Sequence, residues 1–211
     1  MFFDFVSSRN KSRLLPAIAL LLLGLTRAAS AELVITGVFD GPLSGGTPKA
    51  VEVYVVSNVA DLSIYGIGAA NNGGGTDGEE FTFPAGGATA GTYLYIATES
   101  PQFEAFFGFA PNYTSGAASI NGDDAIELFE NGAVVDVFGE IDVDGSGTAW
   151  EYLDGWAYRV SGSGPDGSTF VIGNWTFSGP NAMDGETTND SATTPFPLGT
   201  YGGGVVVESS P

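Results

Sequence analysis

The sequence has 211 residues, with six Lys and Arg, 25 Asp and Glu, and neither His nor Cys. The lack of His and Cys excludes Ser-His-Asp and Cys-His chemistry, His-ligated zinc and disulfide bonds. The net charge of −19 repels phosphate backbones and anionic lipid headgroups, so we expect no direct binding to nucleic acid or membranes. It suits divalent cations, basic partners or a salty medium, and solubility alone also explains it.

Residues 1–31 have the pattern of a Sec-type signal peptide. A basic stretch (residues 9–13) is followed by an apolar run (14–25) and by small residues that end at Ala31. The apolar run is well short of the roughly 20 residues that a membrane span needs. We therefore expect cleavage after Ala31 and a secreted protein, extracellular or periplasmic, with no membrane span after cleavage.

Cleavage at that point would leave Lys49 and Arg159 as the only cations. Against 24 carboxylates they give the mature chain a net charge of −22 over 180 residues. A chain of this length buries about 70% of its unfolded surface and needs no disulfide to fold.

Short runs of β-branched and aromatic residues, separated by Gly, Asn, Asp and Pro, indicate strands and turns. In chain order, the expected strands are residues 32–40, 50–57, 62–70, 79–84, 92–99, 124–130, 133–140, 150–160 and 168–178. Asn131-Gly132, between two of them, is the strongest short hairpin signal. In 100–109, Phe103, Phe106 and Phe107 have helical spacing and predict one short helical turn.

Many short strands with Gly-rich turns predict an all-β fold, a sandwich or a barrel. After residue 178 the strand pattern ends, and residues 179–211 are a Pro/Gly/Thr-rich C-terminal extension. The expected organisation is therefore a signal peptide (1–31), a β domain (32–178) and this extension.

Four segments resemble the lamin-tail domain, in the form found in exported bacterial proteins. They are LVITGVFDG (33–41), KAVEVYVVSNVADLSIYGIG (49–68), NGDDAIELFENGAVVDVFGEIDVDGSGTAWEYLDGWAYR (121–159) and NWTFSGPNAMDGETT (174–188). The resemblance implies an immunoglobulin-like β-sandwich without established catalytic residues. In bacteria such domains often accompany secreted nucleases or phosphatases. Fold alone does not supply a function.

The acidic segment DVDGSGT (142–148) has the spacing of a cation-binding loop. Position 12 of an EF-hand would fall on Leu153 instead of Glu, and a strand is expected before the segment, so an EF-hand is not expected here. A looser calcium loop and a turn shaped by Asp and Gly are the remaining alternatives. The candidate ligands are Asp142, Asp144, Ser146 and the carbonyl of Thr148.

Asp123 and Asp124, in the segment NGDD, pose the same alternative. They could add ligands to a shared calcium ion, or Asp123 could close an Asx turn before the next strand. Glu127, in that strand, is expected on a solvated polar face.

Four aromatic residues in the expected strand 150–160 have even spacing and so should face one side. They are Trp150, Tyr152, Trp156 and Tyr158. They could form part of the sandwich core or an exposed platform that stacks against sugar rings. Arg159 points to the opposite side, where a nearby carboxylate is its expected partner.

These observations predict a secreted, non-catalytic protein of the lamin-tail type that acts as a binding or structural module. Its expected partner is an extracellular protein or polysaccharide, and its only candidate cofactor is Ca²⁺. The alternatives are a calcium-dependent adhesion or carbohydrate-binding domain and an accessory module of a secreted nuclease or phosphatase system. A two-carboxylate glycosidase, which needs no His, is the remaining enzymatic alternative.

Overall fold

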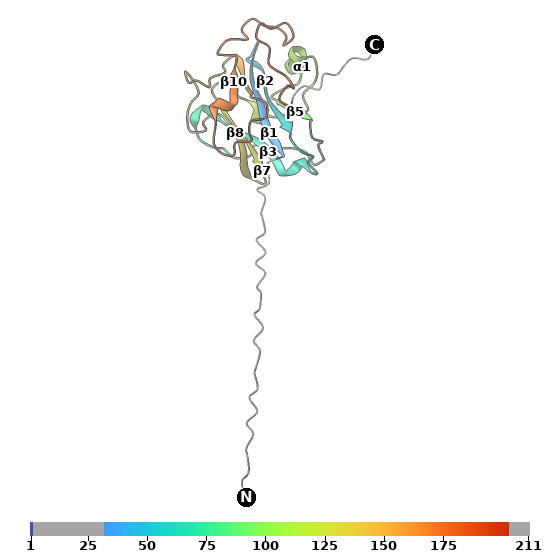
Figure 1. The fold of residues 1–211 in the computed structure, drawn as a ribbon. Helices are drawn as coiled ribbons and strands as arrows, with labels where there is room; N and C mark the ends of the chain where they lie inside the picture. Colours follow the sequence, from blue (N-terminus) through green and yellow to red (C-terminus); the bar gives the residue numbers. More distant parts are fainter. Residues whose placement is uncertain (2–31, 203–211) are drawn as a thin grey trace.

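The computed structural model describes residues 32–202, together with Met1 (Figure 1). Residues 2–31 of the predicted signal peptide and the end of the C-terminal extension, residues 203–211, lie outside the described residues.

The described residues form an all-β fold of two sheets, as expected from the sequence. The larger sheet has the order β10-β9-β1-β2-β5-β6, and the smaller has the order β4-β3-β7-β8. Neighbouring strands are antiparallel except β5 and β6. The strands are β1 (Leu33–Leu43), β2 (Thr47–Val55), β3 (Tyr65–Ala70), β4 (Phe81–Thr82), β5 (Tyr93–Ala97), β6 (Tyr113–Thr114), β7 (Ala125–Glu130), β8 (Ala133–Phe138), β9 (Gly155–Arg159) and β10 (Trp175–Phe177).

The helical and hairpin predictions are confirmed. The one α-helix among the described residues is α1 (Pro101–Phe107), which begins at a proline and ends at Gly108, whose φ is +81°. Asn131 and Gly132 both have positive φ, as a tight β7–β8 hairpin requires. Four single 3₁₀ turns complete the secondary structure, at Leu62–Ile64, Asn71–Gly73, Gly116–Ala118 and Ile172–Asn174.

The main core lies between the two sheets. Alternate residues of β1 and β2, such as Ile35 and Val53, pack with Ile67, Ile126 and Leu128 of the smaller sheet. Each fully buried side chain of this kind contributes about 1.5–3 kcal/mol to folding. This apolar layer holds the two sheets together without a disulfide.

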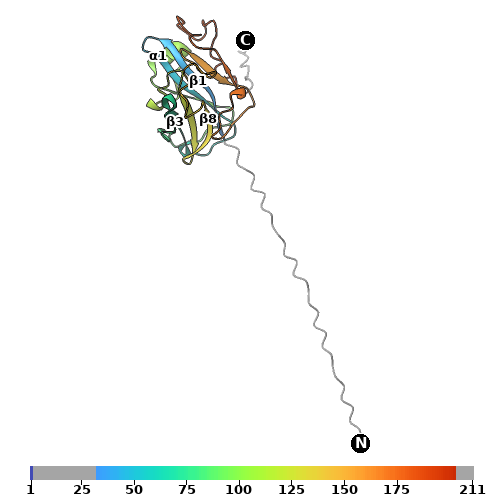
Figure 2. The ribbon, with the colours of Figure 1, turned by 90° about the vertical axis from the view of Figure 1, so that its left-hand side faces the viewer.

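The outer face of the larger sheet is also covered. Phe103 and Phe106 of α1 pack there, together with Met183, Phe196 and Tyr201 of the C-terminal segment (residues 179–202). In both views α1 and the brown C-terminal segment lie near the same, upper end of the molecule (Figures 1 and 2). The extension therefore packs onto the sheet at least as far as residue 202.

A buried carboxylate holds the end of this segment. Glu52 of β2 accepts hydrogen bonds from the hydroxyls of Thr36 (2.6 Å) and Tyr158 (2.8 Å) and from the backbone N–H of Gly199 (2.9 Å). The Tyr158 hydroxyl in turn accepts from the N–H of Thr200 (2.9 Å). Burial raises the pKa of the Glu52 carboxyl, and these donors oppose that rise.

The predicted strand 150–160 is wrong in its first half. β9 begins only at Gly155, and the residue before it, Asp154, has a φ of +42°. A left-handed residue interrupts an extended backbone, so residues 149–154 form a separate turn.

No helix within residues 32–202 has the length and apolar character needed to cross a lipid bilayer.

Candidate functional site

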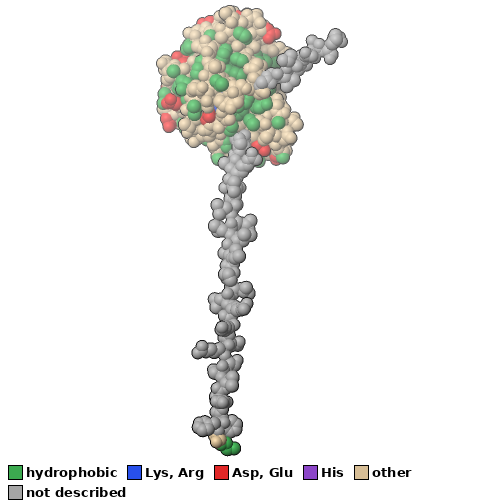
Figure 3. All heavy atoms as spheres, viewed as in Figure 1, with side chains coloured by type: hydrophobic (Ala, Val, Ile, Leu, Met, Phe, Trp, Pro, Cys, Tyr) green, Lys and Arg blue, Asp and Glu red, His purple; other side chains and the backbone are tan. Residues whose placement is uncertain are grey.

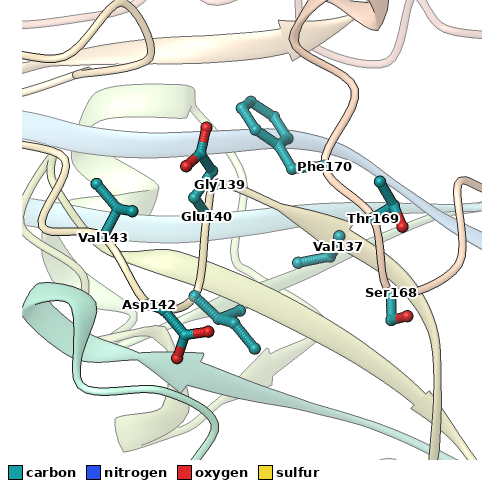
Figure 4. Close-up of a pocket in the computed structure, with 9 residues that line it drawn as sticks. Val137, Gly139, Glu140, Asp142, Val143, Ser168, Thr169 and Phe170 are labelled. Atoms are coloured by element: carbon teal, nitrogen blue, oxygen red, sulfur yellow. The ribbon is translucent and has the colours of Figure 1, made fainter.

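A pocket of about 330 Å³ lies beside the end of β8 (Figure 4). One wall comes from β8 and the turn that follows it, and the other from the segment 168–170. The lining residues are Val137, Gly139, Glu140, Ile141, Asp142, Val143, Ser168, Thr169 and Phe170. The pocket thus combines apolar side chains with two hydroxyls and two carboxylates. Its volume is at the lower end of the range for ligand sites.

The second wall is fixed to β8 by backbone and aromatic contacts. The N–H of Gly167 donates to the carbonyl of Val135 (3.1 Å). The ring of Phe170 lies edge-on to Phe138, at 5.5 Å between centroids, and 6.1 Å from Trp150. Because Phe138 and Trp150 belong to the main core, this wall is anchored to the rigid part of the molecule.

A buried ionic network lies behind the same segment. The Arg159 side chain is fully buried and donates to both oxygens of Asp136 (2.8 Å each) and to Asp166 (2.7 Å). Its Nε donates to the carbonyl of Ile35 (2.6 Å), and its guanidinium lies 4.4 Å above the Trp175 ring. The expectation that Arg159 has a carboxylate partner is confirmed.

This network joins both sheets to the pocket wall. Arg159 belongs to β9 and Asp136 to β8, and Asp136 also accepts from the N–H of Ile35 (2.9 Å) and of Asp166 (2.9 Å). Burial raises the pKa of the Asp136 carboxyl, and the Arg159 charge opposes the rise. The segment that starts at Asp166 is therefore held in one position relative to β8.

Two side chains of the acidic loop, Asp144 and Thr148, bond to the loop's own backbone. The N–H of Ser146 donates to Asp144 (2.9 Å), and this bond lowers the pKa of the Asp144 carboxyl. The Ser146 hydroxyl donates to Asp123 (2.8 Å), and the Thr148 hydroxyl donates to the carbonyl of Gly145 (2.7 Å). The carboxylates of Asp123 and Asp144 therefore both accept hydrogen bonds from Ser146.

The other two aspartates of the predicted calcium site point elsewhere. Asp124 is buried and accepts from the N–H of Asn72 (2.7 Å) and of Asn121 (3.0 Å), so it ties two turns together. Burial raises the pKa of the Asp124 carboxyl. Asp142 lines the pocket. Within residues 32–202, no three carboxylates are grouped closely enough to hold a metal ion.

The four aromatic residues do not share one face, which corrects the strand prediction. Trp150 and Tyr152 belong to the main core between the sheets, whereas Trp156 and Tyr158 lie under the C-terminal segment. The turn before Gly155 breaks the two-residue alternation on which the prediction depended. All four side chains are buried, so in this structure they offer no exposed platform for sugar rings.

The prediction that Glu127 is solvated is also wrong. Glu127 is 3% exposed, and its Oε2 has no hydrogen-bond partner among the described residues. It stands opposite Val137 in the β7–β8 ladder and opposite Gly68 on its other side. The carbonyl of Gly78 lies directly over Gly68, so the 71–80 loop covers this face of the sheet.

Both cations of the described residues are already paired. Lys49 lies 2.5 Å from Asp40, and Arg159 binds Asp136 and Asp166. One face of the molecule shows scattered acidic side chains and no blue patch of Lys or Arg (Figure 3). The surface field is therefore of one sign, and it favours cationic groups.

No protein-family model matches the sequence, and searches of curated proteins and of solved structures find no significant match.

Proposed function

We propose that this chain is an exported, non-catalytic binding module of the lamin-tail type. Its sandwich, of the immunoglobulin-like class, serves as a rigid frame for the pocket between β8 and the segment 168–170. The observation that supports this proposal is the anchoring of the pocket. Both walls are tied to the core through Phe170 and the Arg159 network, as a preorganised binding site requires.

The use of the buried carboxylates also supports binding over catalysis. Glu52, Asp124 and Asp136 each accept several hydrogen bonds that join distant segments. Their role is therefore structural. We propose an extracellular protein or polysaccharide as the partner. The accessory role beside a nuclease or phosphatase rests on the family resemblance alone.

The first test is an assay of the purified chain on DNA, on phosphate esters and on glycoside substrates. We expect no turnover above buffer for any of them. Turnover that is lost in the double variant Glu140→Gln/Asp142→Asn, and retained in Glu104→Gln/Asp190→Asn, would contradict the proposal and assign an enzyme site to the pocket. The second pair, which is exposed, removes the same two charges elsewhere.

Calcium binding is the second candidate, and the meeting of Asp123 and Asp144 at Ser146 favours it. We expect no change in the thermal midpoint on adding calcium and then chelator, because Asp144 and Asp123 already accept hydrogen bonds from Ser146 and Asp142 lies in the pocket lining. A rise of several degrees that the chelator reverses, and that Asp144→Asn abolishes, would establish the calcium site instead.

A further inference from the structure

The sequence contains three Asn-Gly pairs, at residues 72–73, 121–122 and 131–132. In such a pair the backbone nitrogen of glycine can attack the side-chain carbonyl carbon of asparagine, because glycine has no side chain to obstruct the approach. The new C–N bond closes a cyclic imide, the attacking N–H gives up its proton, and the amide group takes up a proton and leaves as ammonia. Water then opens the ring to aspartate or to isoaspartate. The reaction consumes no oxidant or cofactor.

The peptide bond after asparagine has to rotate in this reaction, so the packing around each glycine decides which pair can react. A Cβ at Gly73 would collide with the backbone of Val143 and Asp144, so the chain has no room to move on that side. The N–H of Asn72 donates to Asp124 (2.7 Å), which fixes the preceding residue. The pair 72–73 is therefore held in place, although Asn72 is exposed.

The pair 121–122 is also held in place. Gly122 is buried, and a Cβ there would collide with the backbone of Leu153. The carbonyl of Gly122 accepts from the N–H of Tyr152 (2.7 Å), and the N–H of Asn121 donates to Asp124 (3.0 Å). Rotation of this peptide bond would break contacts on both sides of it.

The pair 131–132 forms the tip of the β7–β8 hairpin. Asn131, Gly132 and Ala133 are all exposed, and a Cβ at Gly132 would meet no atom within 4 Å. The N–H of Asn131 donates to the carbonyl of Ile64 (2.7 Å), whereas the N–H of Gly132 makes no backbone hydrogen bond within residues 32–202. The attacking nitrogen and the amide that it attacks are therefore both free to approach each other.

We propose that Asn131 is a site of spontaneous deamidation, and that the isoaspartate formed there loosens the β7–β8 hairpin. In isoaspartate the main chain runs through the side-chain carbonyl carbon, which adds one CH₂ group to the backbone of a two-residue turn. The register of a hairpin depends on the type and length of its turn. The ladder pair nearest to the turn, Glu130 with Ala133, therefore loses its alignment.

β8 carries this change from the turn toward the pocket. Asp136 on this strand binds Arg159, and Val137 lines the pocket. A loosened β8 weakens both the ionic network and one pocket wall, so the modification limits the working life of the module. This consequence for the pocket rests on the proposed binding function, whereas the reaction at Asn131 does not.

The test is to keep the purified full chain in mildly alkaline buffer and to follow the three pairs by peptide mass spectrometry. An isoaspartyl methyltransferase, which labels isoaspartate but not aspartate, counts the isoaspartate product. We expect Asn131 to react first, and Asn72 and Asn121 to react at least tenfold more slowly, a difference of about 1.4 kcal/mol in the barrier.

The control is the same chain unfolded in guanidinium chloride, in which the three pairs should react at similar rates. Reaction at Asn131 of the folded chain that is no faster than at Asn72 or Asn121 would overturn the proposal.

A matched variant isolates the effect of the altered backbone. Asn131→Asp carries the same charge as the isoaspartate product and keeps an Asp-Gly pair, which suits this turn. Chain with isoaspartate at position 131, separated by chromatography, should unfold several degrees below this variant and exchange the amide protons of β8 faster. Equal midpoints and equal exchange would show that the hairpin tolerates isoaspartate, which would overturn the second part of the proposal.

Discussion

Replacing Arg159 with Met should lower the free energy of unfolding by about 3–5 kcal/mol. The change removes the partner of a carboxylate that is itself fully buried, so Asp136 is left with only two backbone donors. A charge without its counter-ion in a dry site costs several kcal/mol. Urea unfolding followed by tryptophan fluorescence measures the loss, and the thermal midpoint should fall by about 10 °C.

The neighbouring residue supplies the control for this prediction. Val160 is 43% exposed, so Val160→Met introduces the same side chain at a position that faces solvent. Its effect should stay within about 0.5 kcal/mol. A loss of similar size in both variants would show that the network contributes little. Arg159 also forms an ion pair with Asp166, at the start of the segment that forms one pocket wall. Arg159→Met should therefore also weaken ligand binding in the pocket.

Phe196→Ala should detach the C-terminal segment and cost about 3 kcal/mol or more. The Phe196 ring is buried against Phe39 (5.6 Å between centroids) and Tyr158 (5.2 Å), and it rests on Gly37, where a Cβ would collide with it. Without the ring, the segment 179–202 keeps its hydrogen bonds to the sheet and the packing of Met183 and Tyr201, but it loses its central aromatic contact. The variant should therefore loosen the segment 179–202 in the folded protein as well as lower the free energy of unfolding of the whole domain.

Trp156 reports on this detachment directly. Its indole N–H donates to the carbonyl of Thr194 (2.9 Å), so release of the segment exposes the indole to water. We expect a red shift of fluorescence and faster amide exchange at Gly199 and Thr200, with the main core still protected. The exposed Val171→Ala is the matched control. Unchanged exchange in Phe196→Ala would mean that the other contacts of the segment, including those of Met183 and Tyr201, are enough to hold it.

Local signals in the sequence were enough to predict most of the secondary structure. The Asn131-Gly132 hairpin, the Phe spacing of α1 and the β-branched runs each act within a few residues, so they predicted elements that the structure contains. The prediction for 150–160 was wrong because even spacing in the sequence does not reveal a positive φ at Asp154. That single residue sends Trp150 and Trp156 into different layers.

The candidate site depends on contacts that the sequence does not show. Its two walls come from residues about 30 positions apart, brought together by Arg159, Asp136 and Asp166. Glu127 was taken for a solvated residue because alternation indicates a face of the sheet and not what covers it. Here the 71–80 loop covers that face.

The place of β1 in the larger sheet affects how the chain can fold as it is made. β1 pairs with β2 on one side and with β9 on the other. In the second pair, Phe39 lies opposite Trp156, which follows it in the sequence by well over a hundred residues. A chain that emerges N-terminus first presents the second edge of β1 unpaired until most of the sequence has followed. Such an edge can template incorrect pairing, and long-range pairing of this kind is slow. Premature release of the chain would therefore leave this edge free to pair incorrectly.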